Sequence, residues 1–167
     1  MTARACTVAG VADGVGQARD WVVEALHTAG CAGWLVDTAG LVVSELVMNA
    51  VVHTASGQPE GTVRIELLVG VGRARVSVMD AGTEASEPRV PRSCPDPDTA
   101  QASRGLYLVD QWAERIGVHG DGRRGRIVFA DIAEPSTSPS QDTARSGALP
   151  KRRLGTRPGG RIPQESR

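Results

Sequence analysis

The chain has 167 residues, of which 40% are hydrophobic, enough for the core of one domain. Its zero formal net charge hides an uneven distribution, because residues 134–167 carry seven basic and three acidic residues and leave twelve basic and sixteen acidic residues before them. The only lysine is Lys151, in this basic tail, which argues against a Walker phosphate loop or a eukaryotic-type kinase site, since both place a lysine on nucleotide phosphates.

The three cysteines and the chain start indicate a cytoplasmic protein with no membrane partner. Cys6, Cys31 and Cys94 have spacings that fit neither a zinc site nor a redox pair. The first residues lack the basic start and apolar stretch of a signal peptide, and no apolar run approaches the length of a membrane span. The basic tail has no aromatic residue on which bases could stack, so no nucleic-acid partner is expected.

The first half of the chain predicts a strand followed by two helices. Residues 4–10 form a weak strand candidate, and Asp13 can cap the amphipathic helix that follows and ends at Gly30. A second helix begins near Trp34 or Asp37 and runs to about His53. Because this helix is apolar nearly all round, it should lie at the centre of the domain.

The second half predicts two hairpins separated by a loop and a helix. Residues 62–70 and 73–80 alternate apolar and polar residues and meet at a tight turn, so they predict a hairpin with one buried face. Residues 81–103 contain four prolines and no period, which is typical of a functional lid or a disordered insert. A helix resumes at residues 104–116 (RGLYLVDQWAERI), and residues 114–120 then pair with residues 125–132 in a last hairpin. From residue 134 onward the composition predicts disorder.

Three polar residues interrupt the apolar central helix at intervals of four. Glu45, Asn49 and His53 in the run SELVMNAVVHT would lie on nearly one face of that helix. Glu45 and Asn49 alone could be a solvated corner, and His53 could simply interact with the last carbonyls of the helix. Asp80 could likewise just terminate its strand, and Gly82 could just mark a turn.

The order of these motifs carries more information than any one of them. The segments SELVMNAVVHT, VMDAG, SRGLYLVDQWAERIGV and GRIVFADI follow one another as in the ATP-binding domains of the gyrase, histidine-kinase and MutL superfamily. The chain resembles in particular the small bacterial anti-sigma-factor serine kinases, over about residues 5–133. It differs from them in the phosphate cradle, where Ser103 replaces a glycine and no second glycine closely follows Gly82.

The resemblance implies a Bergerat-type fold. This is a two-layer α/β sandwich whose mixed, largely antiparallel sheet of four to five strands is covered on one face by about three helices. The ATP-binding domain would span residues 1–133 with an ATP lid at 81–103, followed by the disordered basic tail 134–167.

The resemblance also implies ATP and Mg²⁺ as cofactors and gives each motif a role. Glu45 would be the catalytic base, and Asn49 would bind Mg²⁺ through its amide oxygen, because Mg²⁺ takes oxygen ligands and is shared with the phosphates. Asp80 would accept a hydrogen bond from the exocyclic amine of adenine. The start of the helix at Arg104 would offer backbone N–H groups to phosphate. The implied nucleotide-binding residues are Asn49, His53, Asp80, Gly82, Arg104, Gly105, Leu106 and Arg126.

The expected function is that of a serine/threonine-protein kinase and anti-sigma factor, which holds a sigma factor and phosphorylates an anti-sigma-factor antagonist. Relatives often form homodimers, a point that the sequence leaves open. One alternative is a catalytically weak switch module that binds ATP only to regulate a protein partner. A further alternative, a structural or nucleic-acid-binding protein, predicts no binding of ATP at all.

Overall fold

The computed structural model describes residues 1–82, 101–120 and 125–134, without the side chains of residues 101–104. Most of the predicted lid, the turn at 121–124 and the tail from residue 135 therefore lie outside the described residues. The elements in chain order are β1 (Thr2–Ala9), α1 (Ala12–Thr28), α2 (Gly33–His53), the 3₁₀ turn η1 (Ala55–Gly57), β2 (Thr62–Gly70), β3 (Arg73–Asp80), α3 (Gln101–Trp112), β4 (Arg115–His119) and β5 (Arg126–Ala133).

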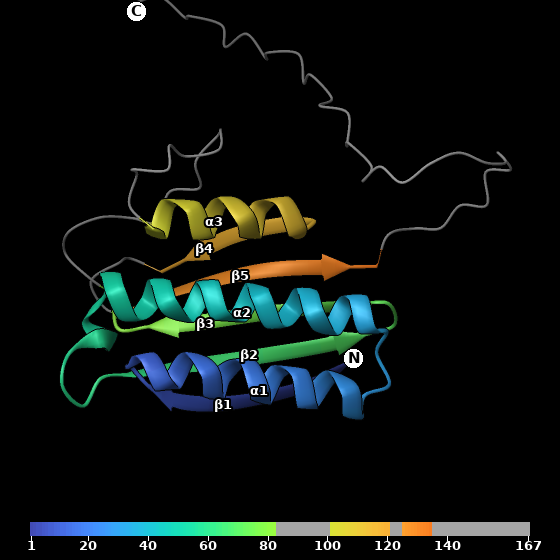
Figure 1. Cartoon of the computed structure of the whole chain (residues 1–167), viewed down its shortest axis with the longest axis horizontal. Coiled ribbons are helices and arrows are strands. Elements are labelled where there is room, and N and C mark those ends of the chain that lie inside the picture. Colours follow the sequence, from blue (N-terminus) through green and yellow to red (C-terminus); the bar gives the residue numbers. More distant parts are fainter. Residues whose placement is uncertain (83–100, 121–124, 135–167) are drawn as a thin grey trace, which may run out of the picture. The chain divides into compact units, whose positions relative to one another are not determined.

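The five strands form one sheet in the order β1-β2-β3-β5-β4, covered on one face by the three helices (Figure 1). Each of the four pairings in the described residues is antiparallel, so the sheet is not mixed. The predicted two-layer α/β sandwich is confirmed. Because β5 lies between β3 and β4, it brings the last segment of the domain next to the end of β3.

The two predicted hairpins are both present. β2 and β3 are joined at the predicted turn, where Gly72 has a φ of 62° and Val71 is fully exposed. A positive φ favours glycine, which explains the turn. The alternating apolar residues of both strands face the helices, where they form the core with α1 and α2. These buried strand residues are Val63, Ile65, Leu67, Val69, Ala74, Val76 and Val78.

α1 has the predicted end but a different start. It begins at Ala12 with Val11 as N-cap and no side-chain cap, so the prediction that Asp13 caps it is wrong. Asp13 lies in the first turn, where a carboxylate interacts favourably with the helix dipole. At the other end Gly30 has a φ of 72°, and the N–H of Cys31 donates to the carbonyl of Leu26 at 3.1 Å. This pattern of a left-handed glycine and a returning hydrogen bond closes the helix.

α2 is the central helix, as predicted. It packs against α1, α3 and the sheet, and it begins at Gly33 and ends at His53. Its length and mean hydropathy of 1.6 would allow it to cross a membrane, but 56% of that apolar window is buried inside the domain. The apolar character of α2 therefore follows from its place in the core.

α3 differs from the prediction at both ends. It starts at Gln101, three residues before the expected start at Arg104, and ends at Trp112, so that the segment from Arg115 belongs to β4. Leu106 and Val109 are buried in the core as expected. Residues 101–103, assigned from the sequence to the lid, are helical.

The sheet face opposite the helices carries a charged and aromatic cluster. Phe129 is 3% exposed, with the guanidinium groups of Arg75 and Arg115 at 4.6 and 5.2 Å from its ring centre and the His119 ring stacked on it. Arg75 also forms two hydrogen bonds with the Asp131 carboxylate, at 2.6 and 2.8 Å.

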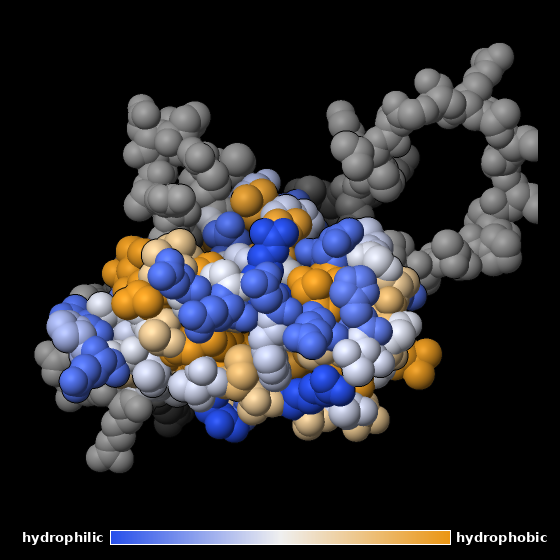
Figure 2. Space-filling view, turned by 60° about the horizontal axis from the view of Figure 1, so that its bottom comes forward, coloured by the Kyte–Doolittle hydropathy of each residue, from blue (hydrophilic) through white to orange (hydrophobic). Residues whose placement is uncertain are grey.

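Figure 2 shows the molecule with its β1–α1 side brought forward. On this side hydrophilic side chains alternate with small hydrophobic groups.

Candidate functional site

The end of α2 is held by a short chain of side-chain hydrogen bonds. The Thr54 hydroxyl donates to the carbonyl of Ala50 at 2.6 Å and accepts from the backbone N–H of Ser56 at 3.1 Å. Thr54 and Ser56 are both buried. A hydroxyl that accepts from the N–H two residues on is a common turn-forming contact, and here it starts η1.

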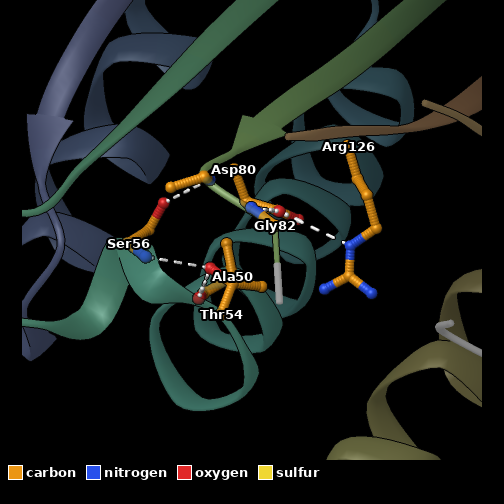
Figure 3. Close-up of polar contacts among 7 residues, drawn as sticks. Ala50, Thr54, Ser56, Asp80, Gly82 and Arg126 are labelled. Carbon is orange, nitrogen blue, oxygen red and sulfur yellow. Dashed lines mark hydrogen bonds and ion pairs between the residues drawn. The ribbon is translucent and has the colours of Figure 1, made fainter. Parts of the chain in front are cut away.

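η1 also anchors the segment that leaves β3. The Ser56 hydroxyl accepts a hydrogen bond from the N–H of Ala81 at 2.9 Å (Figure 3). The N–H of Ala55 also donates to the carbonyl of Gly82 at 2.9 Å. The end of α2 and the end of β3 are therefore tied together. The predicted lid starts from a fixed point.

Three glycines surround the backbone of this junction. A Cβ at Gly10 or at Gly61 would collide with the carbonyl oxygen of Ser56, and a Cβ at Gly57 would collide with the carbonyl of Val51. Gly10 and Gly61 are also joined by a backbone hydrogen bond of 2.8 Å. The junction therefore packs backbone against backbone, without room for side chains.

Asp80 is the buried acid of the site. It is 9% exposed, and its Oδ1 accepts a hydrogen bond from the N–H of Gly82 at 2.7 Å. The same oxygen lies 3.5 Å from Nε of Arg126, which is 5% exposed and has further contacts of its own. Gly82 has a φ of 74°, so the turn that brings its N–H back to the carboxylate requires a residue without a Cβ.

Glu45 and Asn49 lie one turn apart on α2, as the sequence predicts. Glu45 is partly buried, and this burial raises the pKa of its carboxyl above the ordinary value. The carboxylate lies directly against Gly105 of α3, where a Cβ would collide with Oε2. One turn later, Nδ2 of Asn49 is buried without a hydrogen-bond partner among the residues that the structure describes. A buried amide donor with no partner costs about 1–3 kcal/mol, so this atom is suited to a ligand.

The other residues predicted to bind the nucleotide lie at the end of α2 and along α3. His53 is the exposed last residue of α2, and Leu106 is a buried core residue. The side chain of Arg104 lies outside the described set. Arg104 and Gly105 do not open α3, because the helix begins at Gln101. The free N–H groups at the helix start are therefore those of residues 101–104, which shifts the predicted phosphate contact toward the lid.

The polar side chains of the site are better suited to a nucleotide than to a metal ion held by protein groups alone. Within residues 1–82, 101–120 and 125–134, no group of three or more His, Cys, Asp or Glu side chains is placed to hold a metal ion. The unpartnered Nδ2 of Asn49 can donate to a phosphate oxygen, and a half-turn of the amide would present Oδ1 to a phosphate-bound cation instead.

Comparison with known proteins decides the family. The family profile described as the histidine kinase-like ATPase domain matches residues 9–130, which is most of the chain. The chain belongs to this family. The resemblance read from the sequence is thereby confirmed, and Glu45, Asn49, Asp80, Gly82, Gly105 and Arg126 all lie within the matched histidine kinase-like ATPase domain.

Among curated proteins, the domain is similar to anti-sigma F factors. It is 29% identical to that of Halalkalibacterium halodurans over 91 residues and 26% identical to that of Geobacillus stearothermophilus over 91 residues. Each match covers 53% of this chain and 62% of the relative. The chain thus spans less than two thirds of these relatives.

A solved structure shares the fold. The RsbU and RsbW domains of a Mycobacterium tuberculosis protein match with a TM-score of 0.55 and 17% identity, over 80% of this chain and 32% of that one. At this identity the likeness concerns the fold of the histidine kinase-like ATPase domain alone.

Two residues of the site were missed from the sequence. The Ser56 hydroxyl anchors the segment that leaves β3, and the Thr54 hydroxyl holds the N–H of Ser56. Thr54 ends the run SELVMNAVVHT, but neither residue was predicted to have a role. The signal was present in the sequence, because a Thr-Ala-Ser-Gly run directly after an apolar helix is rich in residues that form side-chain turns.

Proposed function

We propose that this histidine kinase-like ATPase domain binds ATP and acts as an anti-sigma factor with serine/threonine kinase activity, in the cytoplasm, on an anti-sigma-factor antagonist. The observation that carries the proposal is the pair on α2: a partly buried Glu45 with a raised pKa, and a buried, unpartnered Asn49 amide one turn away. The similarity to anti-sigma F factors supports the choice of partners.

The side chains divide the work of binding and proton transfer. Asp80 lies at the end of β3, where Oδ1 is held by Gly82, and it would accept the amine of adenine. Asn49 would contact the phosphates or their Mg²⁺ ion. Bound ATP with Mg²⁺ would supply the transferable phosphoryl group. Glu45 would take the proton of the attacking serine hydroxyl, a task for which a pKa raised toward neutrality is suited.

Two measurements on three proteins test the proposal. The wild-type chain, Glu45→Gln and Asn49→Ala are each titrated with ATP and Mg²⁺ by calorimetry. Each is then incubated with labelled ATP and candidate antagonists encoded nearby, and serine phosphorylation is counted. We expect Asn49→Ala to lose ATP binding and Glu45→Gln to bind ATP but to lose phosphotransfer. Gln17→Ala, which removes an exposed amide from α1, is the matched control and should behave as the wild type.

The outcomes separate the proposed function from its alternatives. A wild-type chain that gives no heat with ATP contradicts nucleotide binding altogether. A wild-type chain that binds ATP but phosphorylates none of the antagonists contradicts the kinase and favours an ATP-dependent switch.

A further inference from the structure

Arg126 stands opposite Asp80 across two strands that are not consecutive in the sequence. Asp80 is the last residue of β3, Arg126 is the first residue of β5, and the two are register partners. The side chains are only 4% and 5% exposed, and Nε of Arg126 lies 3.5 Å from Oδ1 of Asp80. Figure 3 shows Nε of Arg126 facing Asp80, while the terminal nitrogens of the guanidinium point away from the Asp80–Gly82 turn.

Gly125, the residue before Arg126, limits where the Arg126 side chain can begin. Gly125 has a φ of 123°, and a Cβ at this position would lie 2.8 Å from the carbonyl oxygen of Asp80. Because Gly125 has no side chain, β5 can start close against the end of β3. The starting point of the Arg126 side chain is thereby fixed relative to the carboxylate.

A carboxylate this deeply buried needs a compensating charge. Without one, a buried acid tends to take up a proton and become neutral, because the desolvation of its charge is costly. Arginine cannot lose its own proton under ordinary conditions, so its charge in the pair is permanent. Arg126 is therefore placed to compensate the buried negative charge of the Asp80 carboxylate.

The contacts of Asp80 are also one-sided. Gly82 and Arg126 both approach Oδ1, and Oδ2 takes no hydrogen bond from the residues that the structure describes. An ionised Asp80 therefore offers Oδ2 as an acceptor only. A protonated Asp80 would offer a donor as well, and the choice of ligand would change with it.

We propose that Arg126 is a positioning residue that sets base specificity: it holds Asp80 as an anionic acceptor, so that the site takes a 6-amino purine and rejects a 6-oxo purine. The inference rests on the proposed binding of ATP and adds to it the residue that makes Asp80 selective. A 6-oxo base presents a carbonyl oxygen and an N–H where adenine presents an amine and a bare nitrogen. Against an anionic Oδ2 this carbonyl is repelled, whereas a neutral carboxylic acid could donate to it.

The test compares ATP with inosine triphosphate, which differ in this edge of the base. Both are titrated with Mg²⁺ into the full chain by calorimetry, for the wild type, Arg126→Gln and Arg126→Lys. The wild type should bind ATP at least about tenfold more tightly. Arg126→Gln, uncharged, should lose most of that preference, and Arg126→Lys, charged, should keep most of it. A structural role would not separate two side chains of similar length by their charge.

The matched control uses the other Arg–Asp pair of the same two strands. Arg75 and Asp131 are also register partners of β3 and β5, but they lie on the opposite face of the sheet. Arg75→Gln makes the same chemical change away from the site and should leave the preference for ATP unchanged. A loss of preference in Arg75→Gln as large as in Arg126→Gln would overturn the inference.

Each result bears on one idea. If the wild type binds neither nucleotide, the proposed function fails first. If the wild type prefers ATP and Arg126→Gln prefers it equally, the role of Arg126 is wrong while ATP binding stands. Should Arg126→Gln not fold, Arg126→Lys keeps the inference testable. A preserved preference for ATP in this charged variant supports the inference, and a lost preference contradicts it.

Discussion

Glu45 and Gly105 touch across the interface of α2 and α3, and the contact depends on the absence of a side chain at position 105. A methyl group there would displace the Glu45 carboxylate, which can move because it is the end of a flexible side chain. We therefore expect Gly105→Ala to reduce phosphotransfer roughly 10- to 100-fold while ATP affinity changes little, since misplacing a reacting group by about 1 Å has effects of that size. Labelled-ATP assays and calorimetry on the same preparation measure both quantities.

A matched glycine in α1 controls for the effect of alanine on a helix. A Cβ at Gly16 would meet no other group within 4 Å. Gly16→Ala should stabilise the fold by about 0.4–1 kcal/mol through the unfolded state and leave phosphotransfer unchanged. Equal losses of activity in both variants would show that the effect at Gly105 is not local to Glu45.

The raised pKa of Glu45 predicts a pH-dependent stability. Burial raises the pKa of this carboxyl, so between its ordinary and its raised pKa the folded chain holds a proton that the unfolded chain has released. The free energy of unfolding therefore falls as pH rises through this window. Glu45→Gln removes the penalty, so its stability advantage over the wild type should be small near pH 4 and larger near pH 8. Urea unfolding at both values checks this, and a difference that is independent of pH would contradict it.

The Asp131–Arg75 pair predicts the opposite sign. The hydrogen-bonded Arg75 guanidinium holds the pKa of Asp131 below its ordinary value, so the pair stabilises the fold above the ordinary pKa of an aspartate and is lost as pH falls through the lowered value. Because both side chains are partly exposed, Asp131→Asn should cost only about 1 kcal/mol at neutral pH and nothing at strongly acid pH. Glu66→Gln breaks the more exposed Arg64 pair and should cost less. An equal cost in both variants would argue against a special role of Asp131.

The Ser56 hydroxyl predicts a link between stability and nucleotide affinity. Ser56→Ala leaves the N–H of Ala81 without its acceptor and should destabilise the fold by about 1–2 kcal/mol. It should also weaken ATP binding several-fold, because the Asp80–Gly82 turn loses an anchor. Ser44→Ala, which removes a hydroxyl bonded within α2, is the control and should be nearly neutral. Thermal unfolding and calorimetry measure the two effects, and an unchanged ATP affinity in Ser56→Ala would refute the link.

The fold was predictable where periodicity or turn chemistry is strong. The alternation of β2 and β3, the left-handed Gly30 and the apolar α2 each left a direct trace in the sequence, and each is confirmed. The start of α1 was not predictable from Asp13, because aspartate is favoured both at the N-cap and in the first helical turn. The residue type therefore does not tell these two positions apart. The start of α3 was missed because Gln101, Ala102 and Ser103 carry no apolar period.

The site was predictable in part. Glu45 and Asn49 share a helix face by spacing alone, and the structure places them as expected. The pairing of Asp80 with Arg126 was not predictable, because it depends on β5 entering the sheet beside β3, and no local pattern gives the register of strands so distant in the chain. The contact of Glu45 with Gly105 likewise arises from helix packing.

The glycines around Ser56 have a consequence for mutational scanning. Gly10, Gly57 and Gly61 would each place a side chain into a backbone carbonyl, so nearly every substitution at these positions should fail. In a saturation library scored for activity they would look as intolerant as Glu45, although a glycine has no side chain with which to transfer a proton. A second score, for protein abundance, would separate the structural glycines from the catalytic residue. Variants at the glycines should score low for both activity and abundance, whereas Glu45→Gln should score low for activity alone.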